Sequence, residues 1–166
     1  MFSPCSPFPS SYTTTSHLGI TNLNRTQPDM ISFTADPSQT VLSASYHVIQ
    51  LLSNARYKST VPITSDSSYG PAYYVAGTSG AGKYTFKAAI YNATEPVPFD
   101  VKFQGIKSGA KATLTVLTAP DAFSANTLDD GVVKDYVDKK SSQVVAGKDG
   151  GFAFELENYS VAVLTT

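Results

Sequence analysis

Three glutamates, Glu95, Glu155 and Glu157, are the residues of this sequence best suited to acid–base chemistry. Glycosidases use two carboxylates about 5–9.5 Å apart, one as the acid and the other as nucleophile or base. On one strand, Glu155 and Glu157 would share a face and lie about 7 Å apart. A solvated strand edge explains the same spacing, and we favour it because Glu155 alternates with the apolar Phe154 and Leu156.

The residue types give little support to metal or redox chemistry. His17 and His47 are the only histidines and Cys5 is the only cysteine, which rules out a histidine–cysteine zinc cluster and an internal disulfide. The aspartates between residues 129 and 138 lack the ligand spacing of a calcium-binding loop. We therefore expect no metal and no cofactor.

The segment GTSGAGKY, residues 77–84, nearly matches a phosphate-binding loop. That loop requires Ser or Thr after the lysine, to hold magnesium, and a helix whose N-terminus faces the phosphate. Tyr84 occupies the hydroxyl position, and residues 83–90 alternate as a strand does. A glycine-rich hairpin loop is the better interpretation.

Three Asn-x-Ser/Thr triplets, beginning at Asn24, Asn92 and Asn158, are candidates for N-glycosylation. Residues 1–19 lack the basic start and apolar core of a signal peptide. Such triplets arise by chance in a Ser/Thr-rich chain, so they favour the secretory route only slightly.

The composition excludes several classes of partner. The 166 residues are 42% hydrophobic and carry a net charge of −1, which suits a packed domain. No basic run supplies the patch that nucleic acid requires, and no apolar run approaches the roughly 20 residues that span a bilayer. We expect neither nucleic acid nor a membrane as a partner.

Tyrosines offer another kind of chemistry, because aromatic rings can stack on sugars. The candidates for such a platform are Tyr69, Tyr73, Tyr74, Tyr84 and Tyr91. Alternation places Tyr84 on the core side of its strand and points Tyr73 and Tyr74 to opposite sides. Core and rim packing therefore accounts for most of them.

One helix and several strands must position these residues. A short apolar run at residues 29–34 predicts a strand, and the segment after it predicts a helix over residues 37–54, with Asp36 or Ser38 as its N-cap. Apolar residues recur along the helix at three- and four-residue spacing, so the helix needs a partner surface.

From residue 57 the hydrophobic period changes to two. Strand candidates cover residues 73–76, 83–90, 99–104, 113–116, 132–137, 152–156 and 161–163. Their spacing predicts a mainly β fold, an antiparallel, jelly-roll-like β-sandwich of about eight strands. Outward positions carry polar residues, so we expect one face of each sheet to meet water.

The chain resembles a known family in five segments. They are PDMISFTADPSQTVLSASYHVIQLLSNAR, beginning at Pro28, and then GPAYYVAG, FKAAIYNATEPVPFDVKF, GAKATLTVLTAPD and YSVAVLTT. These are similar to the C-terminal end of fungal α-L-arabinofuranosidases of glycoside hydrolase family 51. The resemblance covers residues 28–166, and the helix segment and ATLTVLTAP are its most specific parts.

The resemblance implies a division of the chain into three parts. Residues 1–27 would be a disordered Pro/Ser/Thr-rich tail, residues 28–56 the last strand and helix of a (β/α)₈ barrel, and residues 57–166 the C-terminal β-sandwich. Barrel active sites form at the C-terminal ends of strands, so the loop residues Thr34, Asp36 and Gln39 are candidates for the rim of a cleft. The apolar helix would fold back onto the sandwich or stay exposed.

The resemblance also implies a function. The family removes terminal arabinofuranose from arabinoxylan and arabinan with retention, using two glutamates on barrel strands. No glutamate here matches those positions, so no catalytic residue is carried over and the chain alone is expected to be inactive.

The expected role is that of an accessory domain of an extracellular, glycosylated arabinofuranosidase, with the barrel as its partner. The sequence would then be a truncated product, an incomplete gene model or one piece of an enzyme. A carbohydrate-binding module for arabinose-containing polysaccharide is the alternative.

Overall fold

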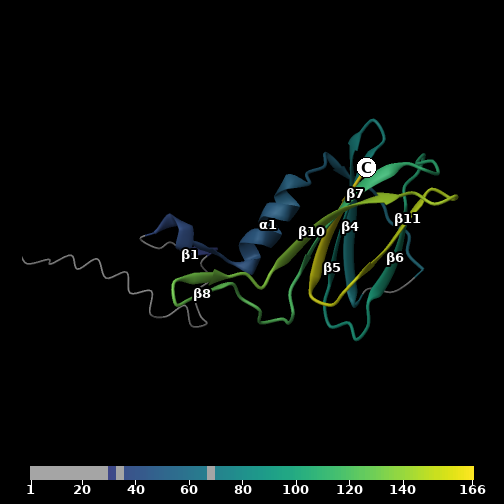
Figure 1. Cartoon of the computed structure of the whole chain (residues 1–166). Coiled ribbons are helices and arrows are strands. Elements are labelled where there is room, and N and C mark those ends of the chain that lie inside the picture. Colours follow the sequence, from purple (N-terminus) through teal and green to yellow (C-terminus); the bar gives the residue numbers. More distant parts are fainter. Residues whose placement is uncertain (1–29, 33–35, 67–69) are drawn as a thin grey trace, which may run out of the picture.

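The structure, a computed structural model, describes residues 30–32, 36–66 and 70–166. Most of its elements are strands (Figure 1). The N-terminal elements are β1 (Ile31–Ser32), the 3-10 helix η1 (Pro37–Gln39), β2 (Val41–Leu42), α1 (Ala44–Asn54) and β3 (Ser59–Thr60). The following elements are β4 (Ala72–Gly80), β5 (Lys83–Ile90), β6 (Val97–Lys102), β7 (Lys111–Thr118), β8 (Thr127–Asp129), β9 (Val132–Lys134), β10 (Asp138–Val145), β11 (Gly151–Leu156) and β12 (Ser160–Thr165).

Two antiparallel sheets form the sandwich. The larger has six strands in the order β10-β7-β12-β5-β4-β3, and the smaller consists of β11 and β6. Leu164 of β12 lies opposite Phe86 of β5 and Leu114 of β7. The apolar residues at every second position of these strands therefore share the inner face of the larger sheet. This arrangement confirms the predicted antiparallel β-sandwich.

The core lies between the two sheets. Phe152, Leu156 and Leu164 are almost completely buried there, and each such side chain contributes about 1.5–3 kcal/mol by leaving water. Phe99 stacks on Phe154 with ring centroids 5.4 Å apart. The alternation read from the sequence therefore has a direct physical cause in this core.

The helix α1 covers part of the opposite face of the larger sheet. Leu51 is buried against Leu117 of β7 and Val163 of β12. Lys87 of β5 donates from Nζ to the carbonyl oxygen of Leu52, 2.9 Å away, and its partial burial lowers the pKa of the ammonium group. The prediction that this face meets water is therefore wrong where α1 and the next segment lie.

The segment after α1 continues this cover. The ring of Tyr57 lies over Gly77 of β4, where an added Cβ would clash with the ring. The Nζ atom of Lys87 is 5.1 Å from the centroid of the same ring. A glycine at position 77 thus lets an aromatic ring lie flat against the sheet.

The predicted helix over residues 37–54 is shorter in the structure. Residues 37–39 form η1, and β2 pairs antiparallel with β1 before α1 begins at Ala44. Ser43, rather than Asp36 or Ser38, caps α1, because its Oγ accepts from the N–H of Tyr46 at 3.2 Å. The assignment of β1 to a barrel strand stays a prediction.

Two further segments differ from their predicted secondary structure. β10 was not predicted, because Lys139 to Gln143 has no apolar alternation; it is an exposed edge strand of the larger sheet. The strand predicted for residues 132–137 ends at Lys134. Residues 77–84 form the β4–β5 hairpin, as predicted, with Ala81 and Gly82 at positive φ in the turn.

Candidate functional site

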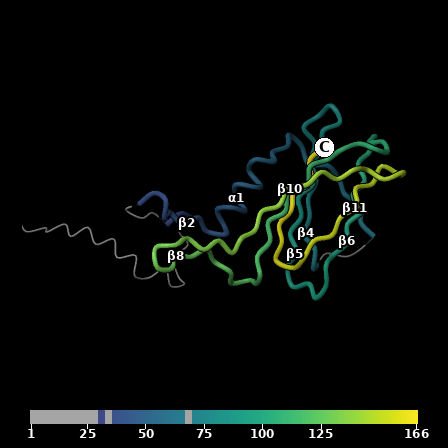
Figure 2. Tube along the Cα trace, viewed as in Figure 1, coloured from purple at the N-terminus to yellow at the C-terminus, as the bar shows by residue number. Residues whose placement is uncertain are grey.

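The predicted rim residues lie where the molecule extends beyond the sandwich. β1, β2 and the β8–β9 hairpin lie together there (Figure 2), and Gln39 Nε2 donates to the carbonyl oxygen of Gly131 at 3.2 Å. The hydroxyl and N–H of Ser38 both donate to Asp36 Oδ1, which lowers the pKa of that carboxyl group. Thr34 lies outside the described residues. Asp36 therefore makes a local contact and Gln39 a long-range one, and their role at a cleft stays a prediction.

A buried asparagine ties this extension to the rest of the fold. Asn126 Nδ2 donates to the carbonyl oxygen of Leu42 at 2.7 Å, and it lies 3.5 Å from Nε2 of His47. Its Oδ1 accepts from the N–H groups of Tyr136 at 2.8 Å and Val137 at 3.3 Å. These bonds end the strand at residue 134 and fix β2 against the loop between β7 and β10.

An apolar groove of about 320 Å³ opens between α1 and the outer face of the larger sheet. Its walls include Val48 of α1, Leu117 of β7 and Val161 of β12. The rings of Tyr91 and Tyr159 meet edge to face at its border, with centroids 6.1 Å apart.

Two exposed aromatic residues stand beside groove residues in the chain or line the groove. Phe123 does not line the groove itself, but it stands in the chain between the groove residues Ala122 and Ser124 and is 95% exposed. Tyr91 is 60% exposed. We call the groove together with Phe123, Tyr91 and Tyr159 the apolar surface. Exposed aromatic side chains beside an apolar groove are candidates for contact with another protein surface.

The three glutamates are exposed. Glu155 points outward from β11, and Glu157 is exposed in the turn after that strand. Neither lines the groove. Glu95 is exposed in the turn between β5 and β6. Their placement matches the predicted solvated strand edge and turn.

Two kinds of feature are absent from the described part of the chain, a cluster of metal-binding side chains and a membrane-spanning helix. Within residues 30–32, 36–66 and 70–166, no group of three or more His, Cys, Asp or Glu is placed to hold a metal ion. No helix in those ranges is long and apolar enough to cross a membrane.

The glycosylation candidates differ in their surroundings. Asn92 is exposed and has a φ of 62° in the turn after β5. The Oδ1 of Asn158 accepts from the N–H groups of Ala93 at 3.2 Å and Tyr159 at 3.0 Å. Asn24 lies outside the described residues. Modification of these asparagines stays a prediction.

The tyrosines take the positions that alternation predicts. Tyr84 stacks on Phe103 with centroids 4.8 Å apart, and Tyr74 stacks on Phe86 at 6.1 Å. Tyr73, on the other side of β4, is 51% exposed. Tyr69 lies outside the described residues. Sugar binding through these rings stays a prediction.

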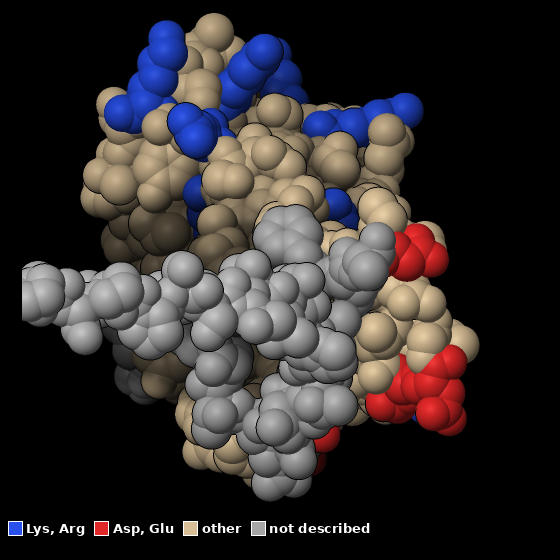
Figure 3. All heavy atoms as spheres, turned by 90° about the vertical axis from the view of Figure 1, so that its left-hand side faces the viewer, with Lys and Arg blue, Asp and Glu red and all other residues tan. Residues whose placement is uncertain are grey.

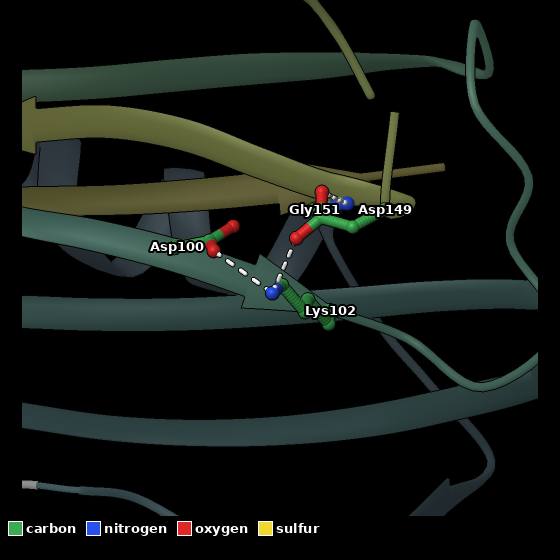
Figure 4. A network of polar contacts seen from close by, with 4 residues as sticks. All are labelled: Asp100, Lys102, Asp149 and Gly151. Carbon is green, nitrogen blue, oxygen red and sulfur yellow. Dashed lines mark hydrogen bonds and ion pairs between the residues drawn. The ribbon is translucent and has the colours of Figure 1, made fainter. Parts of the chain in front are cut away.

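A charged network links the smaller sheet to the loop before β11 (Figure 4). Lys102 Nζ contacts carboxylate oxygens of Asp149 and, at 3.3 Å, of Asp100. These contacts raise the pKa of Lys102, with Asp149 as the larger cause. Lys102 and the N–H of Gly151 lower the pKa of Asp149. The network fixes the β10–β11 turn against the end of β6.

Comparison with known protein families shows to which family the chain belongs. Residues 21–160 match the family described as the alpha-L-arabinofuranosidase C-terminal domain. The chain belongs to this family. The match confirms the resemblance read from the sequence, and it starts at residue 21 rather than at residue 28.

Named relatives support the same conclusion. A probable alpha-L-arabinofuranosidase A of Aspergillus terreus is 38% identical over 149 residues, which are 89% of this chain and 22% of that protein. The alpha-L-arabinofuranosidase A of Aspergillus niger is 34% identical over 144 residues, 86% of this chain and 21% of that protein. The chain thus spans about a fifth of the length of these relatives.

Solved structures share the fold of this arabinofuranosidase domain. The arabinose-bound MgGH51 α-L-arabinofuranosidase aligns with a TM-score of 0.68 at 22% identity, covering 87% of this chain and 22% of that chain. The GH51 α-L-arabinofuranosidase of Thermotoga petrophila aligns with a TM-score of 0.62 at 20% identity, covering 76% of this chain and 29% of that chain.

Sequence reasoning missed two features of the domain. Asn126 stands in the polar loop segment SANTLDDG, where no periodicity distinguishes a buried asparagine from an exposed one. Phe123 was also overlooked, although a lone aromatic residue within the loop APDAFSAN, away from any alternating segment, is a usable signal for an exposed contact residue.

Proposed function

We propose that this chain forms the C-terminal accessory domain of an extracellular α-L-arabinofuranosidase and braces its catalytic barrel without supplying a catalytic residue. The reaction of the whole enzyme would be hydrolysis of terminal α-L-arabinofuranosides in arabinoxylan or arabinan. The names of the relatives and their greater length support this assignment.

The observation that carries the proposal is the apolar surface. A phenylalanine that is 95% exposed, beside an apolar groove, loses the stabilisation that burial would bring; burying such a side chain contributes about 1.5–3 kcal/mol. Aromatic side chains are enriched where protein surfaces meet, and interfaces between domains of one chain resemble such contacts. The barrel is the partner that the family relationship supplies.

The anchored N-terminal segment supports the same role. Gln39 bonds to Gly131, and Asn126 bonds to Leu42, so the residues before α1 are fixed at two points to the segment between β7 and β10. A catalytic domain connected through this segment would be held in one orientation, as catalytic geometry requires. The accessory domain would then act on the reaction by positioning.

Binding between separately produced parts tests the proposal. The Aspergillus terreus relative, truncated after the region that aligns with residues 28–56 so that its own predicted last barrel strand and helix remain, would be titrated with the chain in a calorimeter. We expect saturable binding that Phe123→Ser weakens about tenfold or more, as the loss of a buried aromatic contact does.

A matched control uses another exposed apolar side chain. Val145, at the end of β10, is 55% exposed and lies away from the groove. Val145→Ser should leave the affinity unchanged. Absence of binding, or equal weakening by both variants, would count against the apolar surface as the contact with the barrel.

A further inference from the structure

Cationic side chains gather at one end of the sandwich. β4 ends and β5 begins there, with Gly80 opposite Lys83, and β7 begins there, with Lys111 opposite Val145. Backbone bonds from Gly109 and Ala146 join the loops around residues 107 and 148 at the same end. We call the following residues the basic end: Arg56, Lys58, Lys83, Lys107, Lys111 and Lys148.

The basic end is exposed and largely free of neutralising partners. All of its members are exposed, and none forms an ion pair within the described part of the chain. Lys102 lies nearby, but Asp100 and Asp149 already neutralise it. The potential around this end is therefore positive.

Acidic side chains gather at the opposite end, so the acidic and basic residues that nearly cancel in the net charge of −1 are largely separated in space. They stand before β6, in the segment from the end of β7 to the first residue of β10, and before β12: Glu95, Asp121, Asp129, Asp130, Asp135, Asp138 and Glu157. Lys134 and Lys140 pair with Asp129 and Asp138, each at 2.8 Å. Figure 3 shows this separation, with Lys and Arg along the top of the molecule and Asp and Glu lower down.

We propose that the basic end binds carboxylated polysaccharide, that is, chains that contain uronic acid residues. This proposal rests on the proposed function, because an arabinofuranosidase works on polysaccharide. A linear polyuronate presents repeated carboxylates that several separate cations can contact at once. Electrostatic attraction of this kind raises the local concentration of an anionic substrate around a protein.

The placement of the charges favours a polysaccharide bound at one end over nucleic acid. The basic end has one arginine among lysines, and lysine attracts anionic groups as a compact point charge. The acidic end would also repel a polyanion that wrapped around the domain. A polysaccharide bound only at the basic end of the domain avoids this repulsion. Its attachment would hold a whole enzyme near its substrate.

Affinity electrophoresis of the full chain tests this inference. Gels would contain polygalacturonate, neutral arabinan or no polysaccharide. The mobility in each gel would be divided by the mobility in the gel without polysaccharide. We expect retardation in polygalacturonate that weakens at 0.5 M NaCl, where screening is stronger. The variant K83Q/K107Q/K111Q should bind polygalacturonate roughly fivefold more weakly, the expected loss for three exposed charge contacts.

A matched triple variant at the other end controls for net charge. K134Q/K139Q/K140Q removes the same charge from the acidic end and should leave binding unchanged. Unretarded migration of the wild-type chain, equal weakening by both triple variants, or retention by RNA but not by polygalacturonate would overturn the inference. Both triple variants should still bind the catalytic remainder of the relative, so a failure of this inference is distinguishable from a failure of the proposed function.

Discussion

At the scale of single residues, Asn126 and Lys102 show how polar groups hold irregular segments in place. Asn126 satisfies backbone groups of three other residues from a buried position. Lys102 instead works at the surface, where two carboxylates fix a turn. Neither could be assigned from the sequence, because each depends on partners that only the folded chain brings near.

Asn126→Ala should destabilise the domain by about 2–3 kcal/mol, because it leaves the carbonyl of Leu42 and the N–H of Tyr136 without their partner. Urea unfolding followed by circular dichroism measures the change. Asn54→Ala, at an exposed position at the end of α1, is the control and should stay within about 0.5 kcal/mol of wild type. Equal effects of both substitutions would contradict the assigned contacts.

Asp149 should titrate below the ordinary value of 3.8, because Lys102 and the N–H of Gly151 favour its charged form. A lowered pKa in the folded state contributes stability above the unfolded value, and that contribution is lost as the pH falls through the folded pKa. NMR titration of the Asp149 carboxyl carbon measures the pKa. Lys102→Gln should raise it, whereas Lys107→Gln, in a nearby loop, should not. An Asp149 pKa that stays unchanged in the Lys102→Gln variant would disprove the ion pair between Lys102 and Asp149.

At the scale of elements, the sequence predicts those helices and strands whose hydrophobic residues recur at a regular spacing. β5 and β7 alternate cleanly, so the sequence predicts them. β10 was missed because an exposed edge strand needs no apolar face. The start of α1 was misplaced because Val41 fits the helical stripe, although it is buried in the β1–β2 pair. Whether α1 would cover the sheet depended on contacts between residues far apart in the chain.

Leu51→Ala should destabilise the domain by about 2–4 kcal/mol, because it leaves a cavity between α1 and the larger sheet. Amide hydrogen exchange should also speed up across α1, since this contact protects the helix. Ile49→Ala, on the same helix but at a 52% exposed position, is the control and should change both measurements little. A helix that exchanges equally fast in wild type and variant would show that α1 does not dock as described.

At the scale of the whole molecule, the domain has three distinct surfaces: the apolar surface beside α1, the basic end and the acidic end. The sequence predicts the family and the sandwich, because both follow from local segments. The charge separation could not be foreseen from a net charge of −1, since it depends on the register that brings distant loops together. The apolar surface likewise combines α1 with strands more than 60 residues later in the chain.

Turnover of an aryl α-L-arabinofuranoside tests the central claim most directly. The purified chain alone should release no aryl alcohol above the buffer rate. The truncated Aspergillus terreus relative should gain activity when the wild-type chain is added, and it should gain less from the Phe123→Ser variant. Turnover by the chain alone at enzyme-like rates, abolished by replacing Glu155 and Glu157 with Gln, would contradict the accessory role.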